Sequence, residues 1–501
     1  MKNNQISKKV GIILYIALLL FVLFNLSNSF KQFYGMKLDG DILESTLLLS
    51  GVQKTMDDPI GIKTIINNDK HPIPNRFFSH YSLHKTFREL PLFLQNLCTP
   101  IDSVYYTSAI ARLVMLIMIL LLLATIITGR TNLFSLKFIV VVALLIPFLP
   151  TNGGHLSREM GLIDRSVSYC FFYAMPLIFL LLYYVPIFWN LLHDRIIKMN
   201  WAFILLWAIF AIISCFSGPL NSPIILITNL ILFVYLFIKN WRTIENQSFS
   251  RKCVQTFKAI PKRMYLFLFP IVFLALYSTF LGTFNNAYLE AQLSLKEMYA
   301  ILPKGIWKFF FVSVSYLIMI FLLLINYLII RLKYKNEPQS KKIFGLYQFL
   351  IFFTVLYVLL LPLGGYRPYR PFILRSDTAL PITVLSMITI FYTFLFLLKQ
   401  LKLEKWKYYL KTVYPSVFFL ISLFFLLKNK TYVYNECEKG GLFTIASSEE
   451  ETVALDNDCS VVSWGTIYDP EESRPYGELL YLWNITDKPK LYYSLPESDE
   501  K

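Results

Sequence analysis

The feature that most constrains this chain is its succession of long apolar runs, which recur along most of its 501 residues. A run of about 18 apolar residues is long enough to cross a bilayer as a helix. Only 16% of the residues are charged, well below the roughly 25% of soluble domains, and the mean hydropathy is +0.52. We therefore predict an all-α polytopic membrane protein with about eleven transmembrane helices. The spans are expected near residues 10–29, 105–128, 133–150, 168–189, 201–217, 222–240, 264–283, 308–330, 344–363, 379–398 and 412–427.

The distribution of Lys and Arg predicts the orientation of these spans. If the N-terminus is cytoplasmic, the inner connections carry 24 Lys and Arg, and the short outer connections carry far fewer. An odd number of spans then places the C-terminus outside the cytoplasm. We expect a multi-pass protein of the plasma (inner) membrane, whose outer face carries a long loop at 30–104, short loops at 151–167 and 364–378, and a tail at 428–501. An outward-facing site would have to use substrates that are already activated in the membrane.

The net charge of +16 raises the alternative of a nucleic-acid partner. Because the charge is distributed by membrane side, we predict membrane lipids rather than nucleic acid as partners. The sequence also has no Gly-rich phosphate loop, zinc-ligand spacing or dinucleotide fingerprint.

The tail, residues 428–501, is predicted to be a small β-rich extracytoplasmic domain beside a transmembrane domain at 1–427. Short β-prone runs alternate there with acidic or Pro/Gly turns, and they read "LFTIAS", "VVSWGTI", "LLYLWNI" and "LYYSLP". Cys437 and Cys459 both lie in the tail, so an oxidising compartment would favour a disulfide between them. The alternative is two unrelated free thiols.

The stretch "MKLDGDILES" places Asp39 and Asp41 about a dozen residues after the first span. Asp41 and Glu44 have the spacing of a capping box, in which Asp41 begins a helix and Glu44 reaches back. That explanation leaves Asp39 unaccounted for. A helix start is also a favourable place for an anion or a metal-bound group, so the pair is a candidate site.

The stretch "NRFFSHYSLHK" places His80 and His84 four residues apart, on one face of a helix. The aromatic and leucine positions predict an amphipathic helix on the membrane surface. The two histidines are then ordinary interfacial residues, substrate contacts or a metal pair, although the motif "HExxH" is absent.

The second outer loop, "NGGHLSREMGLIDR", gathers charged and polar side chains on the outer face. They are either salt-bridged within a solvated loop or in contact with an ion or phosphate; the residues are His155, Arg158, Glu159, Asp164 and Arg165. Arg112 lies inside the second span, where an unpaired charge is costly. We expect it to point outward to an acid of the first loop, with Asp102 as the candidate partner.

A late outer loop, "GGYRPYRPFILRSD", is rich in arginine on the side where positive charge is disfavoured. Arginine binds phosphate through two parallel hydrogen bonds and keeps its charge in a partly dry site. We therefore predict a phosphate clamp at headgroup level formed by Arg367, Arg370 and Arg375, with Tyr366 at the interface. The alternative is non-specific anchoring to lipid headgroups.

In chain order, these features are the first span, the Asp pair, the amphipathic loop, the text "SAIARL" (108–113) opening the second span, and the charged outer loops. This order resembles the GT-C superfamily of integral-membrane glycosyltransferases, most specifically over about the first 170 residues. The resemblance implies a GT-C-like fold and a polyprenyl-phosphate sugar as donor. It implies a catalytic role for Asp39 or Asp41, and some members carry second-loop acids that would correspond to Glu159 or Asp164.

The resemblance further implies inverting transfer, in which a carboxylate deprotonates an acceptor hydroxyl and arginines, Arg158 included, stabilise the departing phosphate. Because this chain lacks a clean Asp-x-Asp in the second loop, transfer with an arginine-stabilised leaving group and no metal is favoured. A divalent cation such as Mg²⁺ or Mn²⁺, held by Asp39 and Asp41, is the alternative. The acceptor is a glycan, a lipid or a protein.

Other functions remain open at this point. An O-antigen-type polysaccharide polymerase or ligase also uses arginine-rich outer loops, without a particular need for the Asp pair. A lipid-linked-sugar transporter would need polar residues along a path through the bilayer, whereas these spans are nearly free of charge apart from Arg112. A purely structural membrane protein would leave the clustered arginines unexplained.

Overall fold

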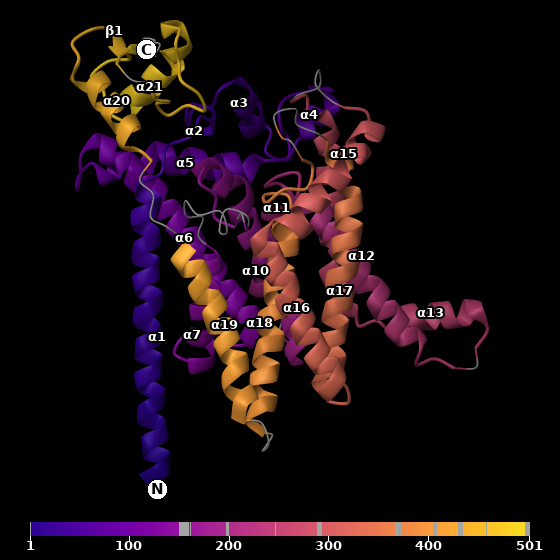
Figure 1. The fold of residues 1–501 in the computed structure, drawn as a ribbon. Helices are drawn as coiled ribbons and strands as arrows, with labels where there is room; N and C mark the ends of the chain where they lie inside the picture. The colour runs from indigo at the N-terminus through magenta and orange to yellow at the C-terminus, as the bar shows by residue number, and fades with distance from the viewer. Residues whose placement is uncertain are drawn as a thin grey trace. The chain divides into compact units, whose positions relative to one another are not determined.

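The computed structural model describes residues 2–149, 160, 162–196, 200–245, 247–287, 293–365, 370, 372–403, 408–428, 434–456 and 458–495, and it is mostly helical (Figure 1). The α-helices are α1 (Lys2–Tyr34), α2 (Asp41–Thr46), α3 (Ser50–Asp57), α4 (Ile62–Ile66), α5 (Phe77–Leu94), α6 (Pro100–Thr128), α7 (Leu136–Leu145), α9 (Val167–Tyr169), α10 (Met175–His193), α11 (Trp201–Cys215), α12 (Asn221–Trp241), α13 (Phe249–Ala259), α14 (Lys262–Leu281), α15 (Leu295–Trp307), α16 (Val314–Lys333), α17 (Pro338–Leu360), α18 (Leu380–Leu403), α19 (Tyr408–Lys428), α20 (Glu436–Ser447) and α21 (Arg474–Leu482). Short 3-10 or π turns are η1 (Ile146–Phe148), η2 (Cys170–Ala174), η3 (Gly282–Phe284), η5 (Lys308–Val312), η6 (Leu361–Gly364) and η7 (Pro470–Ser473), and the strands are β1 (Thr452–Leu455) and β2 (Leu491–Ser494).

Within the described residues, eight helices are long and apolar enough to cross a membrane. They are Lys9–Tyr34, Pro100–Thr128, Val167–His193, Asn221–Trp241, Lys262–Phe284, Val314–Lys333, Pro338–Gly364 and Leu380–Leu401. Shorter apolar helices occupy the places of the other three predicted spans, at Leu136–Phe148, Trp201–Cys215 and Thr412–Leu427. The chain is a helical, multi-pass membrane protein, and the count of eleven spans stays a prediction.

Local sequence signals set the ends of the second span, α6. The hydroxyl of Thr99 accepts the backbone N–H of Asp102, and Pro100 occupies the first helical turn, where its missing N–H costs nothing. Gly129 ends the helix in the left-handed conformation, with φ 67°. The span is therefore bounded by a side-chain cap at one end and a glycine at the other.

The chain divides into two compact units. Unit 1 comprises Met1–Asp57, Phe78–Ile178 and Leu401–Lys501, and unit 2 comprises Asp58–Phe77 and Phe179–Gln400. In unit 2, a hydrogen bond fixes the segment before α5 to the C-terminal part of α14, since Asn75 Nδ2 donates to the Ser278 carbonyl over 3.1 Å.

In unit 1, α1 packs along α6 and α7, and the tail lies at the C-terminal end of α1 (Figure 1). The Trp483 side chain is fully buried in the tail, and its indole N–H donates to the Phe87 carbonyl of α5 over 2.8 Å. The structure joins Cys437 and Cys459 in a disulfide, with their Cα atoms 6.0 Å apart. The tail thus belongs to the same packed unit as the first two spans.

The prediction of a β-rich tail is wrong for most of its length. Within its described residues, the tail contains a parallel sheet of only two strands, β1 and β2, in which Thr452 pairs with Leu491. The run "LYYSLP" contains β2, but "LFTIAS" lies in α20 and "LLYLWNI" begins in α21. In α20 the buried positions are Glu438, Gly441, Leu442 and Ile445, which is the spacing of one helical face.

Candidate functional site

Asp39 lies in the short link between α1 and α2 and is only 4% exposed. Its Oδ2 accepts hydrogen bonds from Ser166 Oγ (2.8 Å) and the Ser168 backbone N–H (3.1 Å). Its Oδ1 is buried without a hydrogen-bond partner among the described residues. The carboxylate therefore fixes the start of α9, where the apolar helix Val167–His193 begins, and joins the link after α1 to the segment before α9.

Arg112 is the buried cation of this region. Its guanidinium donates to the Asp164 carbonyl (3.3 Å), and also to Ser108 Oγ and the Arg165 carbonyl. Both Asp39 and Asp164 also interact electrostatically with Arg112. The structure thus brings Asp39 and Asp164, two predicted site residues, together around one arginine.

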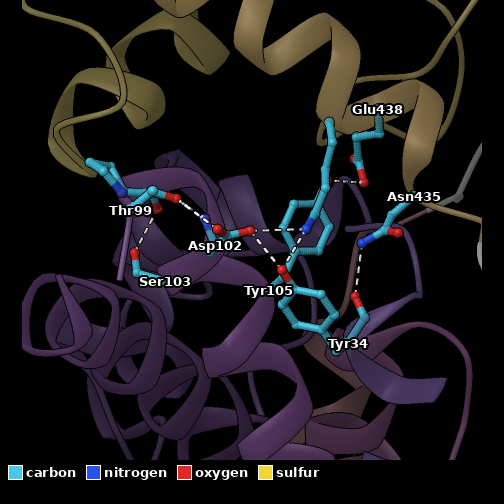
Figure 2. A network of polar contacts seen from close by, with 9 residues as sticks. Tyr34, Thr99, Asp102, Ser103, Tyr105, Asn435 and Glu438 are labelled. Carbon is cyan, nitrogen blue, oxygen red and sulfur yellow. Dashed lines mark hydrogen bonds and ion pairs between the residues drawn. The ribbon is translucent and has the colours of Figure 1, made fainter. Parts of the chain in front are cut away.

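The expectation that Arg112 pairs with Asp102 is wrong, because Asp102 is engaged elsewhere (Figure 2). Asp102 Oδ1 accepts from Tyr34 Oη (2.6 Å) and from Lys439 Nζ (2.9 Å), and its Oδ2 accepts from Thr99 Oγ1 (2.9 Å). Backbone carbonyls from the loop before α9 bind the fully buried guanidinium instead, and the first-loop acid that interacts with it is Asp39.

Asp41 is the first residue of α2 and is half-buried. Its Oδ1 accepts the indole N–H of Trp464, a residue of the tail, over 2.8 Å. The predicted capping box with Glu44 is not formed, since the helix cap is Gly40 and makes no side-chain hydrogen bond. Asp41 therefore binds the tail instead of capping its own helix.

Gly40 is required by the close approach of the tail rather than by a tight turn. Its backbone is right-handed, with φ −66°. A Cβ added there would lie 2.7 Å from Trp464 Cδ1 and 3.2 Å from the Trp464 backbone nitrogen. Only glycine lets the Asp-Gly-Asp backbone and Trp464 come this close.

Titratable groups cluster around Asp41. Partial burial and the nearby Asp41 charge raise the pKa of Glu44. Burial, followed by the charges of Glu44 and Asp41, raises the pKa of Tyr476 on α21. The start of α2 and the tail therefore share an acidic, partly desolvated surface.

His80 and His84 are buried in α5, at 6% and 9% exposure. His80 Nδ1 lies 3.0 Å from Ser45 Oγ, and His84 Nδ1 lies 3.1 Å from the carbonyls of Ser45 and Thr46. The pair thus fastens the C-terminal turn of α2 to α5. The described residues contain no group of three or more His, Cys, Asp or Glu side chains placed to hold a metal ion.

The arginine-rich loop belongs to unit 2, and only part of it is described. Arg375 Nε lies 2.7 Å from Asp377 Oδ1, so an aspartate partly neutralises that arginine. Nearby, Gly305 of α15 packs against the loop, because a Cβ there would lie 3.1 Å from the Leu374 carbonyl oxygen. The predicted residues His155, Arg158, Glu159, Tyr366 and Arg367 lie outside the described residues.

A polar network that the sequence did not reveal anchors the tail to the spans (Figure 2). Glu438 is fully buried, and its carboxylate accepts from Tyr105 Oη (2.8 Å) and from the backbone N–H groups of Leu38 (3.0 Å) and Val462 (2.8 Å). Burial raises the pKa of Glu438 to about 7. The carboxylate ties together the start of the second span, the Asp39 link and the Trp464 loop.

No protein-family model matches this chain, and no curated protein matches it significantly.

Proposed function

We propose that this protein is a membrane glycosyltransferase that moves a sugar from a polyprenyl-phosphate donor to an acceptor on the outer face of the membrane. One observation carries the proposal: the Asp41 carboxylate, just after the first apolar helix, is half-buried and held by the Trp464 indole over 2.8 Å. A partly desolvated carboxylate of fixed orientation is suited to accept a proton from a hydroxyl group. The resemblance to the GT-C superfamily supports the same assignment.

The surroundings of the two aspartates favour different roles. Asp39 is 4% exposed and uses Oδ2 to hold the start of α9, so we assign it a positioning role. Asp41 is more accessible and is our candidate base. In the proposed step, Asp41 takes the proton of an acceptor hydroxyl while that oxygen attacks the anomeric carbon. The bond from that carbon to the phosphate oxygen breaks, its electron pair leaves with the phosphate, and the anomeric configuration inverts.

The arginine-rich segment 364–378 supports the choice of donor. It contains three arginines and one aspartate, which leaves a formal charge of +2. Arg375 is paired with Asp377, and Arg367 and Arg370 are the other two arginines of the segment. We assign phosphate recognition to these arginines by their chemistry, and Arg158 remains a further candidate. Arginine can stabilise the leaving phosphate without Mg²⁺ or Mn²⁺.

The test is a transfer assay on the purified full-length protein in lipid nanodiscs. Radiolabelled polyprenyl-monophosphate hexoses and pentoses are offered together with maltotetraose, cellotetraose or mannotetraose as acceptor, with and without EDTA, and release of polyprenyl phosphate is measured. We expect release from at least one monophosphate donor, unchanged by EDTA. A failure to consume any monophosphate donor would contradict the proposal.

The arginine-rich loop also suits one alternative function, that of an O-antigen-type polymerase or ligase with a lipid-pyrophosphate donor. The same assay with polyprenyl-pyrophosphate glycans separates the two functions. Consumption of pyrophosphate donors alone, together with full activity of both Asp39→Asn and Asp41→Asn, would favour the alternative.

A further inference from the structure

Trp464 combines exposure with fixed orientation. The residue is 57% exposed, yet its indole N–H is bound to Asp41 and its ring centroid lies 5.5 Å from that of Tyr169. Tyr169 in turn contacts Tyr173 edge-to-face, with centroids 5.8 Å apart. An exposed ring held by two separate contacts is a preorganised platform, because little side-chain freedom remains to be lost on binding.

The backbone around Trp464 is held as firmly as its ring. Val462, two residues earlier, has a positive φ of 52°, which is unfavourable for a β-branched residue. The Glu438 carboxylate accepts the N–H of Val462, and the Val462 side chain is 1% exposed. On the other side, Gly40 leaves room for the Trp464 ring. The surrounding structure therefore imposes the position of Trp464.

We propose that Trp464, Tyr169 and Asp41 form a binding subsite for a neutral pyranose of the acceptor glycan. A pyranose has one face of C–H groups, which packs on an aromatic ring, and a rim of hydroxyls, which donate to carboxylates. The platform and the carboxylate lie side by side here, joined by the 2.8 Å hydrogen bond. This inference rests on the proposed function, in which Asp41 receives the proton of the acceptor hydroxyl.

The charge of the surface favours a neutral acceptor over the phosphate-bearing donor. Asp41 and Glu44 lie close enough that the charge of Asp41 raises the pKa of Glu44. A second negative group, such as a donor phosphate, would be repelled at this position. A lipid chain is also disfavoured, since it would leave the Asp41 carboxylate in contact with hydrocarbon.

The experiment measures sugar binding to the full-length protein in nanodiscs by saturation-transfer NMR and calorimetry. The probes are maltotetraose, cellotetraose and mannotetraose. We expect at least one to bind, Trp464→Ala to weaken it about tenfold or more, and Trp464→Phe, which keeps a ring, to retain most of the affinity. Tyr468→Ala is the matched control, because Tyr468 is a comparably exposed aromatic residue of the tail, at 54%, and should leave binding unchanged.

Three results would overturn the subsite. The first is that none of the three probes binds to the wild-type protein. The second is that Trp464→Ala and Trp464→Phe both bind the probe as tightly as the wild type. If Trp464→Ala instead reduces only the affinity of the protein for lipid vesicles, Trp464 is a membrane anchor and the proposal is wrong. Thermal unfolding of each variant shows whether the tail remains folded. If Trp464→Ala does not fold, the affinity of Trp464→Phe for the probe tests the subsite.

Donor turnover separates failure of the subsite from failure of the proposed function. Binding of a neutral probe that depends on Trp464, without any donor consumption, would leave the subsite standing and remove the glycosyltransferase assignment. Sugar transfer with the same acceptor KM in the wild type and Trp464→Ala would remove the subsite and leave the glycosyltransferase assignment standing. With both correct, Trp464→Ala raises the acceptor KM, whereas Tyr468→Ala leaves the acceptor KM and donor turnover unchanged.

Discussion

Asp39 and Asp41 are two residues apart, yet one is buried as a structural acceptor and the other contacts an exposed tryptophan. The neighbours of the two carboxylates explain the difference, since Asp39 meets the start of α9 and Asp41 begins α2 beside Trp464, where Gly40 leaves room for the indole. The sequence indicated that the pair was important but could not assign the two roles. The contacts that assign them come from Ser166, Ser168 and Trp464.

Replacing Asp39 tests its positioning role. Asp39→Ala removes two hydrogen bonds to a buried carboxylate and leaves the Ser168 N–H without its acceptor. We expect a loss of about 3 kcal/mol in the free energy of unfolding, and a partial recovery in Asp39→Asn, which keeps one acceptor oxygen. Thermal and denaturant unfolding in detergent measure both. Asp41→Ala is the control and should cost about 1 kcal/mol; an equal or larger loss for Asp41→Ala would contradict the assignment.

Glu438 predicts a pH dependence of stability. Its pKa is about 7 in the folded chain, against an ordinary value of 4.5. The folded chain therefore holds a proton that the unfolded chain releases, so stability falls as pH rises from about 4.5 to 7 and then levels off. We expect a loss of up to about 3 kcal/mol over this window. Unfolding between pH 4.5 and 8 measures it, and subtracting the profile of Glu438→Gln removes the contribution of the histidines. A flat difference profile would contradict the prediction.

Sequence separation explains which residues were not foreseen. Leu38 and Glu438 are 400 residues apart in sequence, and Asp41 and Trp464 are 423 apart. No periodicity or motif spacing connects positions so distant. A buried glutamate in "NECEKGG" has no local mark that distinguishes it from the exposed acids of the same tail.

At the scale of elements, the long apolar helices could be predicted because their length and composition are unambiguous. The tail could not, because apolar runs of four to eight residues suit either a strand or a short helix. The runs "LFTIAS" and "LLYLWNI" became helical where α20 buries Leu442 and Ile445 on one face and α21 places Gly477 against the chain before β2. Likewise, α5 has amphipathic spacing, but its polar histidines face α2 rather than water.

Two glycines of the tail provide a matched test of this packing. A Cβ on Gly477 of α21 would lie 2.2 Å from the Lys490 carbonyl oxygen, whereas Gly440 of α20 has open space around it. We expect Gly477→Ala to destabilise the tail by about 3 kcal/mol, since backbone must move. Gly440→Ala should stabilise it by up to about 1 kcal/mol through helix propensity. Limited proteolysis and thermal unfolding measure the difference, and similar behaviour of the two variants would show that α21 does not pack as described.

At the scale of the whole molecule, native cysteines test the predicted orientation. Cys98 lies in the loop at 30–104, which is predicted to be outside, and Cys253 lies in the connection at 239–263, which is predicted to be inside; both are half-buried free thiols. We expect a membrane-impermeant maleimide to label Cys98 but not Cys253 in intact cells, and both after permeabilisation. Because burial and the Asp102 charge raise the pKa of Cys98, labelling needs mildly alkaline buffer. Cys98→Ser and Cys253→Ser identify each signal, and the opposite pattern would invert the topology.

The central claim is that Asp41 is the base of a sugar transfer from a polyprenyl-phosphate donor. The most direct measurement is donor turnover by the purified protein, comparing the wild type with Asp41→Asn and with Asp57→Asn, an aspartate of the same loop (30–104) that contacts Gln53. We predict that Asp41→Asn lowers kcat about 100-fold to 10,000-fold while remaining folded, and that Asp57→Asn stays at the wild-type rate. Wild-type turnover in folded Asp41→Asn would contradict the account.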